Sequence, residues 1–286
     1  MIEVLDKEIE KEVKEKPEIN FNVNTLLNSI GKIDYSDFLV LILKVNYKTD
    51  YSSLNMFGKS GLEYILSACK DLETKIINYN QEDDIIKEIK QNVNNKKYVL
   101  VLFADTPLLR KKTIYEILDY FIIKKLCALK FNRGFCFETD YLKKAEKIYN
   151  PQQQTFEEED FYKVFDSASF SIALNILKNR ILSYHQKNGV IINNLTNVYV
   201  DADVNIEKEV SLNGNITLKG KTIIKENANL ENAFIENAIV DENVVIENSI
   251  IKNSVVYKNS KVTDFSVIKN STINENSLIV NKSILD

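Results

Sequence analysis

Hydrophobic residues follow two different patterns along the chain, and the change falls near Gly189. Before this glycine, two uninterrupted apolar runs, 38–43 and 98–103, have the length of parallel strands that are buried on both faces. The other apolar segments predict helices over 58–72, 83–93 and 114–122 and a short strand over 75–77. Strands that alternate with helices indicate βαβ units and an open, largely parallel sheet.

A long helix is predicted at the end of this first part, over 165–188. Its apolar side chains fall at helical steps, and Asp166 or Ser167 is placed to cap its start. Asn188 and Gly189 end the helix, because glycine is favoured just past a helix. We expect this helix to join the two halves of the molecule.

Past Gly189, aliphatic residues recur every six positions. The first set is Val200, Ile206, Leu212, Leu218, Ile224 and Leu230, and the second set, four positions further on, is Val204, Val210, Ile216, Thr222 and Ala228. This period predicts a left-handed parallel β-helix whose triangular coils each take about three such units. Asparagine is dense at the turns, where it tolerates left-handed backbone better than other non-glycine residues. An antiparallel sandwich is the alternative, and six units in register argue against it.

The composition is that of a folded protein, since 44% of the 286 residues are hydrophobic and 27% are charged. The net charge of −4 and a pI near 5.4 give no reason to expect binding to nucleic acid or to an anionic membrane. The sequence shows neither the apolar core of a signal peptide nor an apolar run of about 20 residues. The three cysteines have no metal-binding spacing and are odd in number, which favours a reducing, cytoplasmic location.

Three stretches, 99–109, 180–192 and 199–204, resemble a known family, and 58–63 adds a weaker match. The first looks like a strand that ends in an acidic residue and Pro-Leu, the second like the end of a linking helix, and the third like a first β-helix coil. Together they resemble the bacterial bifunctional UDP-N-acetylglucosamine pyrophosphorylase and glucosamine-1-phosphate acetyltransferase family, which is called GlmU-like. That family joins a uridyltransferase domain, through a long helix, to a left-handed β-helix acetyltransferase domain.

The resemblance implies a fold class of α/β plus β, in which a reduced, Rossmann-like nucleotidyltransferase domain precedes a left-handed parallel β-helix. The expected segments are a charged N-terminal extension over 1–36, a degenerate nucleotidyltransferase-like domain over 37–165, the linking helix over 166–188 and the β-helix over 189–286. We expect a truncated relative, because the chain stops after about five coils.

The loop that holds the triphosphate in this family departs furthest from the family pattern. The family uses a Gly-rich loop with an arginine, followed by a Pro-Lys pair, to surround the phosphates with amides and cations. Here no glycine or arginine occurs between Lys32 and Phe57, so the backbone cannot approach a phosphate closely. Lys44 and Lys48 remain as candidate nucleotide-binding point charges. The uracil-reading loop has no counterpart, and 130–135 runs directly into a strand that the family reaches only after its sugar-binding lobe.

The magnesium site that the resemblance implies is half present. In the family, an Asp at the end of the central strand and an Asn before the linking helix hold the ion against the phosphates. Asp105 matches the first ligand, and Phe165, which cannot coordinate a cation, falls at the second. Asp166 would have to substitute by shifting one position, although it is also the expected helix cap. The structural alternative for Asp105 is a polar residue that terminates a strand.

The acetyltransferase chemistry of the family uses a histidine of the later coils as general base. The one histidine of this chain, His185, falls in the last turn of the linking helix. We expect it to be exposed there and favourably placed against the helix dipole. The sequence therefore predicts no catalytic residue in either half.

The family features that have no counterpart here belong to ligand-contacting loops, while the buried strands and the β-helix register are retained. We therefore expect a protein that has lost both chemistries, needs no cofactor and acts as a binding, regulatory or assembly subunit. The alternative is a reduced sugar-phosphate nucleotidyltransferase of the UDP-N-acetylglucosamine pathway that uses magnesium at Asp105. As partners we expect a second and third copy, in a homotrimer formed through the β-helix, and a further protein. The aliphatic residues expected to be free for such contacts are Ile223, Val245, Ile250 and Val255.

Overall fold

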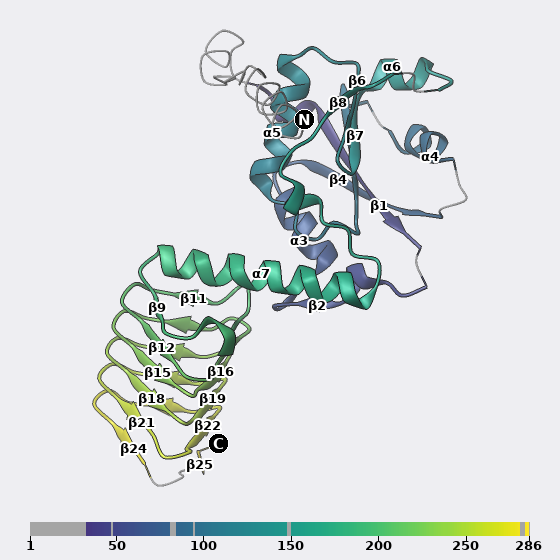
Figure 1. Ribbon diagram of the computed structural model, residues 1–286. Helices are drawn as coiled ribbons and strands as arrows, with labels where there is room; N and C mark the ends of the chain where they lie inside the picture. Colours follow the sequence, from purple (N-terminus) through teal and green to yellow (C-terminus); the bar gives the residue numbers. More distant parts are fainter. Residues whose placement is uncertain are drawn as a thin grey trace, which may run out of the picture.

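A computed structural model describes residues 33–46, 48–80, 84–93, 95–147, 150–280 and 284–285. Nearly all of the predicted N-terminal extension lies outside these residues. The described chain forms an α/β domain and a β-helix, and helix α7 (Ser167–Lys187) runs between them (Figure 1). Within the described part of the chain, no helix has the length and apolar character needed to cross a membrane.

The α/β domain is built on a six-stranded sheet with the strand order β4-β1-β5-β7-β6-β8. Its strands are β1 (Phe38–Val45), β4 (Glu73–Tyr79), β5 (Tyr98–Phe103), β6 (Ala128–Phe131), β7 (Gly134–Glu138) and β8 (Gln152–Gln154). Strand β1 pairs in parallel with β4 and β5, as the apolar runs predict. Strand β7 is antiparallel to both of its neighbours, which the predicted βαβ pattern did not include. The two-residue turn between β6 and β7 forces this direction, because so short a connection can only make a hairpin.

Helices cover both faces of this sheet. Alternate side chains of β1 therefore belong to two different cores, one on each face. Phe38, Val40 and Ile42 belong to a core that includes side chains of α3 (Gly61–Ala68) and α5 (Lys111–Ile123). Leu39, Leu41 and Leu43 belong to a second core, with side chains of α4 (Ile85–Asn92) and α6 (Thr139–Lys144). Burial on both faces is the reason that the strand is apolar throughout. The remaining short elements of the domain are 3-10 helices η1 (Tyr35–Asp37), η2 (Tyr51–Ser53) and η3 (Glu158–Phe161) and the hairpin of β2 (Asn55–Met56) and β3 (Lys59–Ser60).

Helix α7 begins and ends where the sequence predicts. Asp166 caps its first turn by accepting a hydrogen bond from the Ser169 amide, and Gly189 follows its end at a φ of +91°, in the left-handed region. The prediction for His185 was wrong, because this residue is only 4% exposed. The last turn of α7 packs against the first coil of the β-helix, and the buried side chain faces the cavity that also contains Ala202 and Val204.

The β-helix consists of three sheets of short parallel strands that meet at the corners of each coil (Figure 1). The first sheet contains β10 (Val198–Val200), β13 (Ile216–Lys219), β16 (Phe234–Glu236), β19 (Ile250–Lys252), β22 (Val267–Lys269) and β25 (Ile284–Leu285). The second contains β11 (Asn205–Ile206), β14 (Ile223–Ile224), β17 (Ile239–Val240), β20 (Val255–Val256) and β23 (Thr272–Ile273). The third contains β9 (Ile191–Ile192), β12 (Ser211–Asn213), β15 (Asn229–Glu231), β18 (Val245–Glu247), β21 (Lys261–Val262) and β24 (Leu278–Ile279), and η4 (Leu195–Asn197) precedes β10. All the predicted inward residues are buried, so the left-handed β-helix is confirmed.

Asparagine residues hold the corners of the coils. Asn243, Asn259 and Asn276 stand above one another at φ values between +57° and +60°. The Asn243 side-chain amide donates to Asn259 Oδ1 at 3.1 Å, and that of Asn259 donates to Asn276 Oδ1 at 3.2 Å. Asparagine therefore serves twice at these corners, because it tolerates the left-handed backbone and also links successive coils.

Candidate functional site

The carboxyl ends of β1 and β5 lie side by side, since Leu43 is in register with Phe103. In open α/β sheets this edge is where ligands bind. Lys44 lies near the end of β1, and Asp105 follows β5 by two residues. The fold thus brings two of the sequence-predicted site residues to the same edge of the sheet.

Asp105 is buried, with 5% of its surface exposed, and its carboxylate is held by an arginine of the same chain. Arg133 Nε donates to Oδ1 at 2.6 Å, and Nη2 donates to Oδ2 at 2.5 Å. The guanidinium also lies over the Phe103 ring, 4.3 Å from its centroid. A two-pronged pair of this kind is among the strongest side-chain hydrogen-bonding arrangements. The guanidinium therefore occupies both oxygens that a divalent cation would use.

Arg133 reaches this position because of the short β6–β7 turn. Its neighbour Gly134 begins β7 and is in register with Leu102, at the carboxyl end of β5. A Cβ at Gly134 would lie 2.5 Å from the Val101 carbonyl oxygen, so glycine permits the close approach of the two strands. The role of Arg133 was not predicted from the sequence, although a two-residue turn between two short apolar runs is a hairpin signal.

Lys44 is also paired within the chain. Its ammonium lies 2.7 Å from Asp50 Oδ2 and donates to Ser53 Oγ at 3.3 Å. Burial opposes ionisation of Asp50, but hydrogen bonds from Lys44, Ser52 and Ser53 lower its pKa to about 2. The Asp50 carboxylate is therefore charged at neutral pH and competes with any phosphate for Lys44. Lys48 is exposed to solvent.

The second predicted metal ligand, Asp166, is used as a helix cap. Its carboxylate accepts from the amide of Ser169 at 2.8 Å and from the hydroxyl of that residue at 2.6 Å. These hydrogen bonds lower the pKa of Asp166. Phe165 is 51% exposed and offers no ligand. Among the residues that the structure describes, no three His, Cys, Asp or Glu side chains converge on a position that could hold a metal ion.

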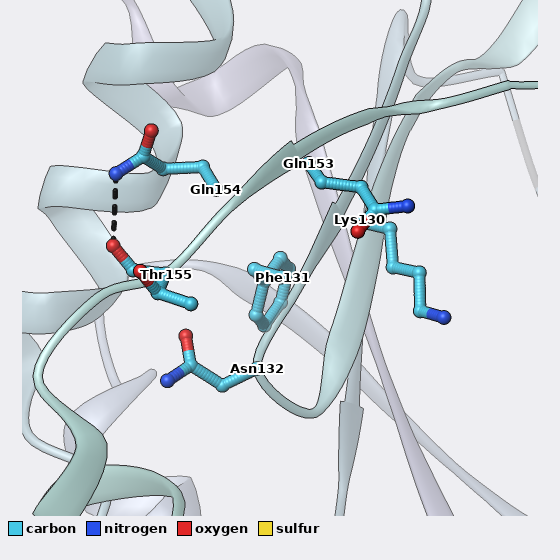
Figure 2. A pocket seen from close by; sticks show the side chains of 6 residues that line it. All are labelled: Lys130, Phe131, Asn132, Gln153, Gln154 and Thr155. Carbon is cyan, nitrogen blue, oxygen red and sulfur yellow. Dashed lines mark hydrogen bonds between the residues drawn. The ribbon is translucent and has the colours of Figure 1, made fainter.

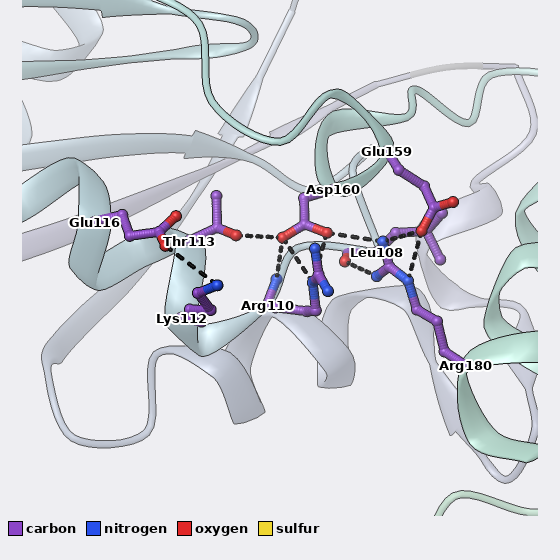
Figure 3. Close-up of polar contacts among 8 residues, drawn as sticks. All are labelled: Leu108, Arg110, Lys112, Thr113, Glu116, Glu159, Asp160 and Arg180. Atoms are coloured by element: carbon purple, nitrogen blue, oxygen red, sulfur yellow. Dashed lines mark hydrogen bonds and ion pairs between the residues drawn. The ribbon is translucent and has the colours of Figure 1, made fainter. Parts of the chain in front are cut away.

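A second buried carboxylate, which the sequence did not single out, holds the domain to α7 (Figure 3). Asp160 is fully buried and accepts from Arg110 Nε at 2.8 Å, from Arg180 Nη2 at 2.7 Å and from the Thr113 hydroxyl. Arg180 lies on α7 and also donates to the Leu108 carbonyl oxygen at 2.6 Å. Because this carboxylate is fully buried and is paired with two arginines from separate elements, we assign this cluster to structure and not to catalysis.

A cavity of about 380 Å³ lies beside β6 and β8, the last two strands at one edge of the sheet (Figure 2). Its lining residues are Lys130, Phe131, Asn132, Gln153, Gln154 and Thr155. Asn132 uses its side-chain oxygen to accept from the Phe156 amide at 2.8 Å. The lining has no carboxylate, so it lacks the ligand that magnesium prefers in proteins.

Comparison with known proteins finds several relatives of one kind. The chain is 30% identical to the bifunctional protein GlmU of Streptococcus thermophilus over 159 residues, which covers 54% of this chain and 33% of that protein. It is 28% identical to GlmU of a Hydrogenobaculum species over 129 residues (36% and 28%) and 25% identical to GlmU of Streptococcus agalactiae over 194 residues (66% and 38%). The matches thus span about a third of the length of these relatives. No protein-family model matches the chain.

Solved structures give weaker matches. Rv0371c from Mycobacterium tuberculosis H37Rv is 9% identical with a TM-score of 0.38, covering 50% of this chain and all of that one. The 4-diphosphocytidyl-2C-methyl-D-erythritol synthase from Anaerococcus prevotii is 9% identical with a TM-score of 0.37 and the same coverage. These scores are too low to support an argument, so the strand pairing and the sequence matches define the likeness. On those grounds the chain is GlmU-like: it is similar to part of bifunctional protein GlmU and has a Rossmann-like sheet followed by a left-handed β-helix.

Proposed function

We propose that this protein is a GlmU-like cytoplasmic subunit that has lost uridyltransferase and acetyltransferase chemistry and acts in binding, regulation or assembly. The observation that carries the proposal is the two-pronged pair between Arg133 and Asp105. A buried carboxylate whose two oxygens are both engaged by a guanidinium has to give up that pair before it can bind magnesium. Magnesium would therefore have to displace a charge-assisted, two-pronged pair, a kind of hydrogen bonding that is about twice as strong as that between neutral groups.

The other candidate residues support the same proposal. Lys44 is neutralised by Asp50, and Asp166 is committed to the first turn of α7. No histidine occurs in the β-helix, and His185, the one histidine of the chain, is buried in α7. Asp105, Lys44 and Asp166 are thus all engaged by neighbours in this chain.

Calorimetric titration with UTP and with UDP-N-acetylglucosamine, each with magnesium, tests the proposal. We expect no saturable heat from the folded protein with either nucleotide. Magnesium-dependent binding that is lost in an Asp105→Ala variant would overturn the proposal. It would instead support a reduced nucleotidyltransferase that uses magnesium at Asp105. A Glu158→Ala variant serves as the control, because Glu158 is exposed and is not one of the candidate residues.

We also propose that the protein forms a homotrimer through the β-helix. Outward aliphatic residues follow two of its three sheets, and among them Ile250 and Ile239 remain about two-fifths exposed in the single chain, at 38% and 37%. Phe265 beside the first sheet and Leu278 on the third are more exposed still. Exposed apolar columns of this kind mark association surfaces.

Sedimentation equilibrium distinguishes the trimer from a monomer of 33.0 kDa. We expect a trimeric mass at micromolar concentration, and a shift towards the monomer in an Ile239→Lys/Ile250→Lys double variant. A monomeric mass for the unmodified protein would contradict the trimer. In that case the same aliphatic columns would be the first surface to probe for a different protein partner.

A further inference from the structure

The six-stranded sheet ends at β4, and one side of this strand is open. Among the described residues, β4 is an outer strand and pairs only with β1. The Asn46 amide donates to the Tyr79 carbonyl oxygen at 3.0 Å, so the backbone polar groups of Tyr79 point towards β1. Because these groups alternate in direction along a strand, those of Thr74, Ile76 and Asn78 point away from the sheet. Each of these three residues therefore offers a backbone donor and an acceptor to a further strand.

The side chains of β4 differ between the two faces of the sheet. Ile76 is in register with Ile42, so it lies on the face that α3 and α5 cover. It is nevertheless 43% exposed. On the opposite face, Glu73 and Lys75 are also exposed. A strand that fits beside β4 therefore has apolar side chains on the α3 face and polar side chains on the other.

The outer strand at the other edge of the sheet, β8, does not have this character. Its three residues are all glutamines, Gln152, Gln153 and Gln154, so neither face of this strand is apolar. A strand with one apolar and one polar face therefore matches the edge at β4 and not the edge at β8.

One segment of this chain has the pattern that β4 requires. Residues 19–24 read Ile-Asn-Phe-Asn-Val-Asn, in which apolar residues alternate strictly with asparagine. Alternation over four to eight residues is the signal of a strand with one buried and one exposed face. The segment lies outside the described residues, which begin at residue 33.

The length of the intervening chain allows this segment to reach the open edge. Ile33 precedes η1 and β1, so the described chain starts near the amino end of the sheet. A strand added beyond β4 lies two strand spacings, about 10 Å, from β1. Residues 25–32 span up to about 26 Å when extended. An antiparallel strand would end beside the amino end of β4, so the chain could continue to β1 without crossing the sheet.

We propose that residues 19–24 add to the open edge of β4 as an antiparallel strand, with Phe21 opposite Ile76. In this register all three apolar side chains of the segment lie on the same face as Ile76, and Asn22 lies opposite Lys75 on the other face. The strand pairs the outward backbone groups of β4 and covers Ile76. It also brings the charged residues that precede it to the carboxyl edge of the sheet, beside the candidate site. The proposal does not depend on whether the protein binds a nucleotide.

Cysteine cross-linking in the full chain tests both the edge and the register. The background is Cys127→Ser, which removes the exposed thiol. The test pair is Asn22→Cys with Lys75→Cys, because opposite residues at a non-hydrogen-bonded position lie close enough for a disulfide bond. We expect oxidation to give an intramolecular disulfide, detected by faster migration in non-reducing electrophoresis and located by peptide mass spectrometry.

The matched control moves the second cysteine to the other outer strand, as Asn22→Cys with Gln153→Cys, and is expected to give no intramolecular disulfide. The absence of a disulfide in the test pair would overturn the proposal, and so would an equal yield in the control pair. A disulfide that joins two chains through the test pair would also overturn it, because the edge would then take the strand of a second copy.

Hydrogen exchange gives a second readout that needs no new cysteine. We expect the amides of Ile76 and Asn78 to be protected in the unmodified protein, because each would donate to the added strand. Phe21→Asp is expected to make them exchange at least tenfold faster, whereas Asn22→Asp, with the same charge on the exposed face, is expected to leave them protected. Exchange of both amides at the rate of exposed amides in the unmodified protein would overturn the proposal, and so would equal protection in the two variants.

Discussion

The α/β domain and the β-helix both contain parallel strands, but their polar residues are arranged differently. In the β-helix, Leu230 pairs with Ile246 only 16 residues further on, and each coil repeats the pattern of the previous one. In the α/β domain, Leu41 pairs with Val101, 60 residues away, and no neighbouring segment repeats the arrangement. The repeated unit satisfies its polar groups at every corner, whereas the domain satisfies them once, through long-range contacts.

The ion pairs of the two parts differ in how far they are buried. In the β-helix, Lys252 and Glu236 pair at 2.9 Å on the surface, each about one-third exposed, and such pairs contribute little to stability. In the domain, Asp105 and Asp160 are buried and each is held by arginine. The domain therefore has a few buried, specific ion pairs, whereas the β-helix has surface pairs of one repeated kind.

The largest expected effect is on the β-helix core. Ile246 is fully buried among the stacked inward residues, so Ile246→Asp places a charge without a partner in an apolar core. We expect the free energy of unfolding of the β-helix to fall by more than about 4 kcal/mol. Urea denaturation followed by circular dichroism measures this. Val245→Asp, one residue earlier and outward-facing, is the matched control and is expected to cost far less; equal effects would contradict the inward register.

The next effect is on the polar cluster between the domain and α7. Asp160→Ala leaves Arg110 and Arg180 without their shared carboxylate, and we expect a loss of about 2–4 kcal/mol in the free energy of unfolding. Glu158→Ala, at an exposed site in the same 3-10 helix, is the control. Thermal denaturation of the two variants checks the difference. A loss below about 1 kcal/mol for Asp160→Ala would show that the cluster does not hold the two parts together.

A smaller effect is expected at the asparagine corners. Asn243→Ala removes the hydrogen bond to Asn259 and places alanine at a φ of +57°, so we expect a cost of about 1–2 kcal/mol. Asn243→Gly removes the same hydrogen bond but relieves the backbone, and it is expected to cost less. If the two variants were equally destabilised, the side-chain ladder and not the backbone would account for the preference for asparagine. Urea denaturation of both variants makes this comparison.

The smallest effect is a pH dependence at the junction. Burial lowers the pKa of His185 below its usual value of about 6.5, and Arg110 and Arg180 line the same cavity. The unfolded chain therefore takes up a proton at a higher pH than the folded chain does. The stability contributed by the neutral imidazole is present above about pH 6.5 and is lost as the pH falls towards the lowered pKa.

Melting temperatures at pH 7.5 and pH 5.5 check this contribution. We expect the fall in melting temperature to be smaller in a His185→Leu variant than in the unmodified protein. The carboxylates titrate equally in both proteins. The difference between the two falls in melting temperature therefore reports His185 alone. An identical fall in the two proteins would contradict the assignment.

The sequence predicted the strands and helices of both parts well where one local rule was enough. The apolar runs at 38–43 and 98–103 became β1 and β5, and the six-residue period became the β-helix core. The antiparallel β7 was missed because its direction depends on the turn before it and not on its own apolar pattern. The buried state of His185 was missed because only the packing of α7 on the first coil covers it.

The candidate site shows the same division. The sequence placed Asp105 at the end of a strand and Lys44 near the end of its neighbour, but it could not show that each has a charged partner. Arg133 lies 28 residues from Asp105, and Asp201 lies against Gly58, which is 143 residues away. Contacts at such separations leave no local pattern in the chain.

By itself, the sequence determined the order of the parts, the apolar faces of the strands and the repeat of the β-helix, because each follows from the spacing of neighbouring residues. The tertiary structure alone decided which charged side chains were paired with each other and that the His185 side chain was buried. Those outcomes depend on which distant segments meet, and the same side chain is a ligand, a structural ion pair or a buried acceptor according to its neighbours.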